Sequence, residues 1–368
     1  MNLLVITSIE FPSPTAGANR IISYSKGLIE EGCSINVLSV RKKTISNIDR
    51  RIKIINTGGK SRGIILSLLS MFKYLCSNNY DYYLVVSNSI VLITIVKLAS
   101  LIKRTKILIE KSEFPFVLMN LSLVGKIYSK FYIRYIYSLF DGMVIMTKPL
   151  IEYFQDKIPK KTQIFHLPMT VDFERFDLCQ SEDTDERYIA YCGNMSGNKD
   201  GVLNLLDSFA LFTKHYKDIR LKLIGGATID ELNSIKEYAK DQKRVDFYGV
   251  AEASEIPQLL SSAKLLVLAR PNSLQSLGGF PSKLGEYLST GNPVLVTKVG
   301  EIPNYLTDGV NAFLVEPDNN ILFAKKMMWI FENYELAKKI GCNGKKIAKT
   351  TFSYKSKSKD FFDFLTKL

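Results

Sequence analysis

The chain has 368 residues, of which 46% are hydrophobic and 23% are charged, a composition typical of a globular protein and not of a disordered or fibrous one. This length predicts two domains of ordinary size. The formal net charge is +13, and residues 1–180 carry +11 of it, which predicts an anionic partner such as membrane lipid, a phosphorylated substrate or nucleic acid.

The cysteines and histidines argue against several kinds of site. The five cysteines have no CxxC or CxxH spacing, and an odd number cannot all pair within one chain, so we expect a reduced, cytosolic compartment and no zinc site. Two histidines are too few for a His-rich metal centre and make a Ser-His-Asp triad a poor hypothesis. The start of the chain does not have the pattern of a secretory signal, and the longest apolar run, 90–102, is too short to span a bilayer.

Short β-rich runs alternate with amphipathic helical stretches along the chain, which predicts parallel sheets covered by helices on both faces. The strands expected in the first half are 3–8, 35–40, 52–56, 83–87, 106–109 and 143–146. The alternation restarts at 188–192 and continues with expected strands at 221–224, 245–248, 265–268, 294–297 and 312–315. A helix at 319–332 and a Lys-rich stretch close the chain.

Residues 181–186 include four acids and no apolar residue, so we predict an exposed linker there. We expect one Rossmann-like, doubly wound domain at 1–175 and a second at 187–349, with a helix at 350–368 packing back on the first. Parallel sheets of this kind bind ligands at the carboxyl ends of their strands, so we expect the active site in the cleft between the two domains.

The stretch from Ser276 to Pro293 carries the strongest functional signal. Within the run Gly279-Phe280-Pro281-Ser282, Pro281 sits where the first residue of a helix belongs, and the free N–H groups of such a helix start attract phosphate. Glu286 lies four residues after Ser282, on the same helix face and about 6 Å along the axis, which suits a carboxylate that holds ribose hydroxyls. The alternative is a surface glutamate that follows an ordinary Gly-Pro turn.

Taken with its neighbours, this stretch resembles the family 4 retaining glycosyltransferases of the GT-B fold, as they occur in bacterial polysaccharide assembly. The resemblance covers nearly the whole chain and is strongest from Tyr191 to Asp318. The motifs that carry it are Cys192-Gly193-Asn194 through Lys199, LIGG at 223–226, VDFYGV at 245–250, the Glu286 helix, and GNPVLVTKVGEIPNYLTDGVNAFLVEPDN at 291–319.

The resemblance implies two Rossmann-like domains that face each other across a cleft, an acceptor-side domain first and a domain that binds the nucleotide sugar second. It implies that Lys199, Ser282 and Glu286 bind the donor, and that Gly17 approaches its diphosphate as closely as only glycine permits. The departing phosphate would be stabilised by cations and backbone N–H groups, so no essential metal or other cofactor is expected.

The sequence departs from the family pattern at two positions. Gly278 stands where the first of two glutamates eight residues apart is usual, which leaves in doubt the contact that this carboxylate makes. Asn194 stands where many members have an arginine against the diphosphate. Lys199 would then carry more of the compensating charge, helped by Arg270 at the end of the preceding strand.

Two further groups of residues point to the acceptor. Many relatives place a histidine after the fourth strand of the first domain, and this chain has Glu113 there, either to contact the sugar or the acceptor hydroxyl or as an ordinary surface carboxylate. Three cations lie four residues apart on one helical stripe, interleaved with aromatic residues including Phe131, Tyr132 and Tyr135. This stripe suits a bilayer interface or a lipid-phosphate acceptor, and the alternative is a solvated face over an aromatic core. The cations are Lys126, Lys130 and Arg134.

The sequence therefore predicts a cytoplasmic enzyme, peripheral at the inner face of the plasma membrane, that moves a sugar from a nucleoside-diphosphate sugar to a glycan or lipid-linked acceptor in the synthesis of capsule, O-antigen or exopolysaccharide. The alternatives are a GT-B sugar-nucleotide epimerase and a non-catalytic relative that binds glycan or membrane. Nucleic acid is not an expected partner, because the charge is not joined to any known RNA- or DNA-binding module.

Overall fold

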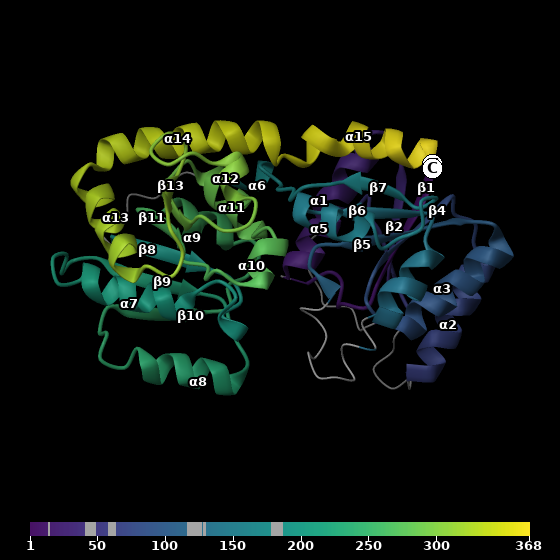
Figure 1. Cartoon of the computed structure of the whole chain (residues 1–368), viewed down its shortest axis with the longest axis horizontal. Coiled ribbons are helices and arrows are strands. Elements are labelled where there is room, and N and C mark those ends of the chain that lie inside the picture. The colour runs from purple at the N-terminus through teal and green to yellow at the C-terminus, as the bar shows by residue number, and fades with distance from the viewer. Residues whose placement is uncertain (14, 41–48, 58–63, 116–126, 128–129, 178–186) are drawn as a thin grey trace. The chain divides into compact units, whose positions relative to one another are not determined.

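The computed structural model describes residues 1–13, 15–40, 49–57, 64–115, 127, 130–177 and 187–368 (Figure 1). The chain forms two compact units: unit 1 is Met1–Thr170 together with Tyr354–Leu368, and unit 2 is Val171–Ser353. The change from unit 1 to unit 2 thus falls five residues before position 175, and the chain returns to unit 1 after residue 353. The linker expected at 181–186 lies outside the described residues.

Unit 1 is built on a seven-stranded parallel sheet with the strand order β3-β2-β1-β4-β5-β6-β7. Its central strands are nearly continuous apolar runs, as expected of parallel strands that are buried on both faces. The last strand was not predicted from the sequence. The strands are β1 (Asn2–Thr7), β2 (Ser34–Ser39), β3 (Lys53–Asn56), β4 (Tyr82–Val86), β5 (Lys106–Lys111), β6 (Gly142–Ile145) and β7 (Gln163–His166).

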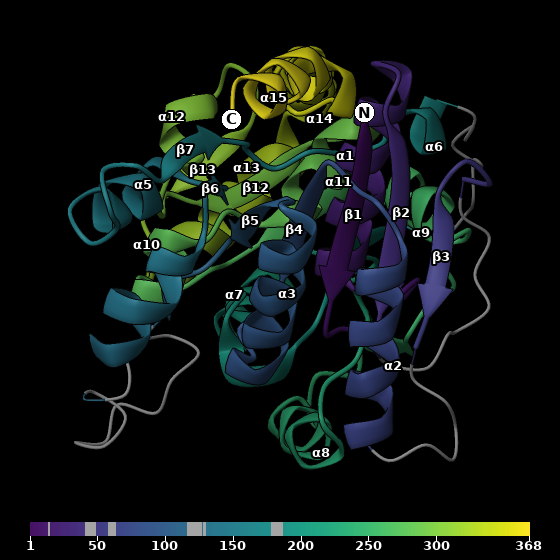
Figure 2. The ribbon, with the colours of Figure 1, turned by 90° about the vertical axis from the view of Figure 1, so that its right-hand side faces the viewer.

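Different helices cover the two faces of this sheet (Figure 2). On one face, α1 (Ala16–Glu30) and α15 (Tyr354–Lys367) share a core with the sheet. The other face is covered by α2 (Ile64–Ser77), α3 (Ile90–Lys103), the short π-helix η2 (Tyr132–Ile136), the 3₁₀ turn η3 (Tyr137–Leu139) and α5 (Lys148–Gln155). We expected the end of the chain to pack back on the first domain, and α15 shares a core with the sheet of unit 1.

Unit 2 contains a six-stranded parallel sheet with the order β10-β9-β8-β11-β12-β13. Each of these strands coincides with a predicted one to within about two residues, the usual scatter of element boundaries. The strands are β8 (Tyr188–Cys192), β9 (Arg220–Ile224), β10 (Val245–Gly249), β11 (Leu265–Leu268), β12 (Val294–Thr297) and β13 (Phe313–Val315).

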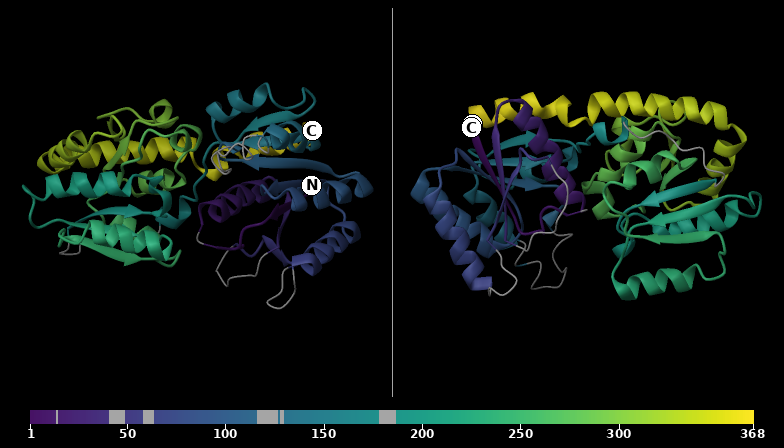
Figure 3. Two further views of the ribbon diagram at one scale, coloured as in Figure 1. Left: turned by 60° about the horizontal axis from the view of Figure 1, so that its bottom comes forward. Right: turned by 180° about the vertical axis from the view of Figure 1, so that it is seen from behind.

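The helices of unit 2 also flank both faces of their sheet, as the rotated views show (Figure 3). Among them, α7 packs with α13, and α11 packs with α9 and α14. Two parallel α/β sheets of this kind confirm the predicted fold class. The helices are α6 (Glu174–Asp177), α7 (Val202–Phe212), α8 (Ile229–Tyr238), α9 (Ile256–Ser261), α10 (Leu274–Gly278), α11 (Ser282–Thr290), α12 (Ile302–Tyr305), α13 (Asn320–Glu332) and α14 (Tyr334–Thr351), with the 3₁₀ turn η4 at Ser196–Asn198.

The packing of α15 generates a prediction about stability. Phe361 is buried, stacks on Phe165 with 5.2 Å between ring centroids, and meets Tyr24 edge-on. Phe361→Ala should therefore lower the free energy of unfolding of unit 1 by about 3–5 kcal/mol, because it removes a large buried ring and leaves a cavity. Urea unfolding followed by far-ultraviolet circular dichroism measures this loss.

Two controls accompany the measurement. Lys359→Ala changes an exposed residue of the same helix and should alter stability by less than about 0.5 kcal/mol. Trp329, the single tryptophan, lies in unit 2, so its fluorescence should report an unchanged transition of that unit. Equal stability of Phe361→Ala and Lys359→Ala would contradict the packing described for α15.

Candidate functional site

The turn after β8 is shaped by hydrogen bonds to Asn194 and Gly197. The Asn194 side chain is exposed, and its Oδ1 accepts from the N–H of Ser196 at 2.9 Å. The N–H of Gly197 donates to Oε1 of Glu231 at 2.9 Å, and Glu231 lies in the first turn of α8. Asn194 thus forms the turn with its own side chain, at the position where an arginine is usual in the resembling family.

Two glycines allow the elements around this turn to approach closely. A Cβ on Gly193 would lie 2.0 Å from Nζ of Lys283, so a side chain at position 193 would displace the Lys283 ammonium. Gly201 has a φ of +71°, and a Cβ there would lie 1.7 Å from the carbonyl oxygen of Ala269, at the end of β11. The ends of β8 and β11 and the starts of α7 and α11 therefore converge.

A buried cluster of charges lies at this point of convergence. Asp200 is 8% exposed; its Oδ2 accepts a hydrogen bond from Nζ of Lys283, and its Oδ1 lies 3.5 Å from Nε of Arg270. Nζ of Lys283 also donates to the hydroxyl of Tyr191 at 3.2 Å. Burial alone would raise the pKa of Asp200, but the charges of Lys283, Arg270 and then Lys199 outweigh burial and lower the pKa.

Arg270 occupies a buried position within the cluster. Its side chain is 1% exposed, and its Nη1 donates to the carbonyl oxygen of Gly279 at 3.0 Å. In this arrangement the guanidinium holds the turn between α10 and α11. The sequence predicted that Arg270 helps Lys199 to compensate the charge of the diphosphate. The structure buries the guanidinium beside Asp200 and the turn at Gly279, and contact with the donor stays a prediction.

Helix α11 begins at Ser282, one residue later than the sequence predicted, and Pro281 is its N-cap. Phe280 is buried against Tyr305 and Phe352, with ring centroids 5.5 and 5.3 Å away. The chain entering α11 is therefore anchored by an aromatic side chain on one side. The first N–H groups of the helix, including that of Ser282, have no acceptor within the helix.

Glu286 follows one turn later and is paired with an arginine. Its Oε1 lies 3.2 Å from Nη1 of Arg175 in α6, and Nη2 of Arg175 donates to the carbonyl oxygen of Ala253 at 2.7 Å. The Glu286 side chain keeps 17% of its surface exposed. Burial raises the pKa of Glu286, and the nearby charges of Arg175 and Lys283 act against that rise.

The structure brings most of the predicted donor site together within unit 2. The segments that converge on Asp200 contain Asn194, Lys199, Arg270 and the turn 279–281. Glu286 belongs to α11, the helix that begins at this point. Lys199 is half-buried and precedes Asp200 directly.

The remaining predicted residues belong to unit 1. Gly17 is exposed in the first turn of α1, and Glu113 is half-buried two residues beyond the carboxyl end of β5. Lys130 and Arg134 are exposed, whereas Lys126 lies outside the described residues. Tyr132, one of the aromatic residues interleaved with the cations, is 1% exposed and belongs to the core of unit 1, as the alternative of a solvated face over an aromatic core predicts for this residue.

Sequence reasoning did not single out Asp200, Lys283, Tyr191 or Arg175. Lys283 stands inside the GFPSK run and Asp200 directly follows Lys199, so local signals existed for these two residues. Arg175 has no such signal, since its partner Glu286 is 111 residues away in the sequence.

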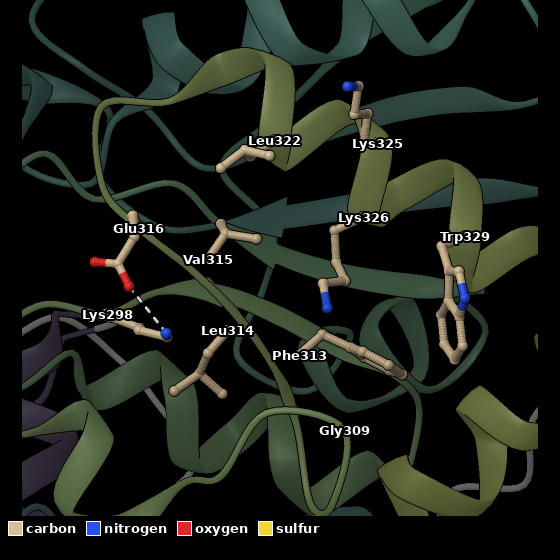
Figure 4. Close-up of a pocket in the computed structure, with 10 residues that line it drawn as sticks. All are labelled: Lys298, Gly309, Phe313, Leu314, Val315, Glu316, Leu322, Lys325, Lys326 and Trp329. Carbon is tan, nitrogen blue, oxygen red and sulfur yellow. Dashed lines mark hydrogen bonds and ion pairs between the residues drawn. The ribbon is translucent and has the colours of Figure 1, made fainter.

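The described part of the chain contains no cluster of three or more His, Cys, Asp or Glu side chains able to hold a metal ion, and no helix with the length and apolar character needed to cross a bilayer. A hollow of about 470 Å³ lies beside β13 and α13, apart from the predicted donor site (Figure 4). Its lining consists of Lys298, Gly309, Phe313, Leu314, Val315, Glu316, Leu322, Lys325, Lys326 and Trp329.

Known proteins resemble this chain in sequence. Residues 173–347, which lie within unit 2, match the family model described as glycosyl transferases group 1. The chain is 25% identical over 132 residues to an uncharacterized glycosyltransferase of Methanocaldococcus jannaschii, which covers 36% of each protein. The matches to curated relatives span only 24–41% of the length of those proteins.

Solved structures resemble the chain over its whole length. The crystal structure of Anabaena HepE in complex with UDP has a TM-score of 0.74 at 17% identity, with all of both chains covered. Sucrose-phosphate synthase from Thermosynechococcus elongatus has a TM-score of 0.78 at 13% identity, covering 100% of this chain and 99% of the other. The protein therefore has the GT-B fold.

The buried cluster gives a second prediction. Asp200→Asn leaves Lys283 and Arg270 buried without their carboxylate, so it should lower the free energy of unfolding of unit 2 by about 3–5 kcal/mol. Trp329 fluorescence during urea unfolding reports on this unit. In the control Asp218→Asn, which breaks the exposed pair of Asp218 with Arg187, the loss should stay within about 1 kcal/mol. Similar losses in the two variants would show that the cluster does not hold unit 2 together.

Proposed function

We propose that the protein is a retaining glycosyltransferase of family 4 that moves a sugar from a nucleoside-diphosphate sugar onto a glycan or lipid-linked acceptor in surface polysaccharide synthesis. The observation that carries the proposal is the convergence, inside a glycosyltransferase group 1 domain, of Lys199, Lys283 and the start of α11, with Glu286 one turn further on. HepE, a structural neighbour of the whole chain, was crystallised with UDP and with UDP-glucose.

The charges of the cluster suit a diphosphate. One carboxylate, Asp200, faces two cations, Lys283 and Arg270, and Lys199 adds a third positive charge beside them. The excess positive charge lies next to the unsatisfied N–H groups at the start of α11. Cations and dipoles held in place in this way stabilise the negative charge that develops on the leaving phosphate. We propose that the transfer reaction needs no essential metal ion.

Glu286 is proposed to hold the ribose. A carboxylate accepts hydrogen bonds from two adjacent hydroxyls, and Arg175 fixes the orientation of this one by pairing with Oε1. Because Arg175 is itself held by the carbonyl of Ala253, the carboxylate is positioned before the ligand arrives.

The acceptor is proposed to meet unit 1. Glu113 lies near the carboxyl end of β5, at the edge where parallel α/β sheets bind ligands, and Gly17 keeps its proposed place against the donor diphosphate. Glu113 is our candidate for contact with the sugar or the acceptor hydroxyl. The surplus of cations in residues 1–180 supports a lipid-linked acceptor and a peripheral position at the inner face of the plasma membrane.

The roles of Lys199 and Glu286 can be tested by mutation. Lys199→Ala and Glu286→Ala should each lower turnover more than about tenfold, because each removes an interaction with the donor that the transition state needs. The donor is first identified by the thermal shift that a panel of UDP, GDP, ADP and TDP sugars produces, and transfer is then measured with that donor. Circular dichroism and Trp329 fluorescence confirm that the variants are folded.

Two exposed residues of unit 2 provide matched controls, and Lys217→Ala and Glu332→Ala should keep normal turnover. Near-normal transfer by Lys199→Ala or Glu286→Ala would count against the assignment. Release of nucleotide and an epimerised sugar in the absence of any acceptor would identify an epimerase instead.

A further inference from the structure

Unit 1 exposes large hydrophobic side chains on only one side of its sheet. Ten such side chains are exposed among its described residues, by 50–74%, and none of them belongs to α1 or α15. They lie on α2, on α3 and in the segment from 127 to 135. They are Ile65, Leu66, Leu69, Val91, Leu98, Leu101, Ile102, Ile127, Phe131 and Tyr135.

Helix α3 is apolar on its buried and on its solvent side. Its buried stripe includes Val96 and Ala99, which pack on the sheet, while Leu98 and Leu101 point the other way and are 50% and 64% exposed. The exposed apolar positions from Val91 to Ile102 extend about 16 Å along the helix. A helix that is apolar all round normally has its outer side covered by protein or lipid.

Elements on both sides of α3 also expose apolar side chains. Helix α2 packs beside α3, as Figure 2 shows, and both bury their inner stripes in the same core cluster. On the other flank, Nζ of Lys97 in α3 donates to the carbonyl of Leu139, and the rings of Phe131 and Tyr135 lie together with centroids 4.8 Å apart. We call the ten exposed side chains together the apolar face.

Cations surround the apolar face. Helices α2 and α3 contain Lys73, Lys97 and Lys103 but no acidic residue, and Arg104 follows the end of α3 directly. Lys130 and Arg134 are exposed between the aromatic residues of the third segment. Among the described residues no ion pair involves these cations, and Lys97 donates to the backbone carbonyl of Leu139.

We propose that the apolar face docks on the surface of a lipid bilayer that contains anionic lipid. The exposed aliphatic and aromatic side chains would enter the boundary between headgroups and acyl chains, while the surrounding lysines and arginines pair with anionic headgroups. The inference rests on the proposed function in one respect, because a lipid-linked acceptor would give the docking its purpose.

The charges favour a bilayer over a second copy of the chain. A symmetric dimer through the apolar face would bring together two sets of lysines and arginines from elements that carry no acidic residue, and such like-charge contacts oppose association. An anionic membrane supplies the opposite charge. Ten exposed apolar side chains on neighbouring elements indicate an interaction site rather than ordinary exposure of single residues.

Vesicle binding tests the proposal. The full-length protein is sedimented with vesicles of phosphatidylcholine mixed with phosphatidylglycerol, and with vesicles of phosphatidylcholine alone. We expect binding to the anionic vesicles that weakens as salt is added, and at least about tenfold weaker binding of the triple variant Leu69→Glu/Leu98→Glu/Leu101→Glu. The matched control Ile229→Glu/Ile321→Glu/Leu336→Glu changes three equally exposed residues of unit 2 and should bind like the wild type.

A charge variant separates the contribution of the cations. Lys103→Gln/Lys130→Gln/Arg134→Gln should lower binding to the anionic vesicles and leave any binding to phosphatidylcholine unchanged. The thermal shift caused by the nucleotide is recorded on the same preparations. The triple glutamate variant should keep that shift, which shows that it is folded and binds the donor.

Several results would overturn the proposal. These are a wild-type protein that ignores anionic vesicles, a triple glutamate variant that binds them normally, or a wild-type dimer that this variant converts to monomer without any vesicle binding. A protein that shows no nucleotide shift with any donor, yet binds vesicles in the expected pattern, would contradict the proposed function while supporting the docking surface.

Discussion

The geometry of unit 2 depends on the ion pairs of the buried Asp200 carboxylate. Asp200 faces Lys283 from α11 and Arg270 from the end of β11, and it directly follows Lys199, so one charge joins three separate parts of the chain. Burying a charge is costly unless it is paired, and the pairs that satisfy Asp200 also fix the turn at Gly279 from which α11 begins. The structural pairing and the proposed binding site are thus built from the same residues.

The same cluster makes the departure at Asn194 compatible with the proposed binding of a diphosphate. Asn194 supplies no charge, whereas Lys283, Arg270 and Lys199 do. The cluster carries more positive than negative charge, so its lysines can meet a diphosphate without an arginine at position 194. Unit 1 has a buried ion pair of its own, between Arg20 and Glu110, while its exposed lysines and arginines lie beside apolar side chains.

The sequence predicted the fold well because buried parallel strands appear as apolar runs separated by helical stretches. It missed β7, because Gln163–His166 is a short edge strand with polar residues at both ends. Tyr132 lies two residues from both Lys130 and Arg134, so a helical period places it on the side opposite to these cations, and the structure buries it in the core of unit 1. The start of α11 could be predicted from adjacent residues. The pairs Asp200–Lys283 and Arg175–Glu286 could not, because their members are 83 and 111 residues apart.

The central claim is that the start of α11 and the adjoining lysines bind the diphosphate of an activated sugar. A crystal structure of the full chain with the nucleoside diphosphate that gives the largest thermal shift tests it most directly. The account predicts phosphate oxygens within hydrogen-bonding distance of the first N–H groups of α11 and of Lys199 or Lys283, with ribose hydroxyls at Glu286. A nucleotide bound elsewhere in unit 2, for instance in the hollow beside β13, with the start of α11 unoccupied, would contradict the account.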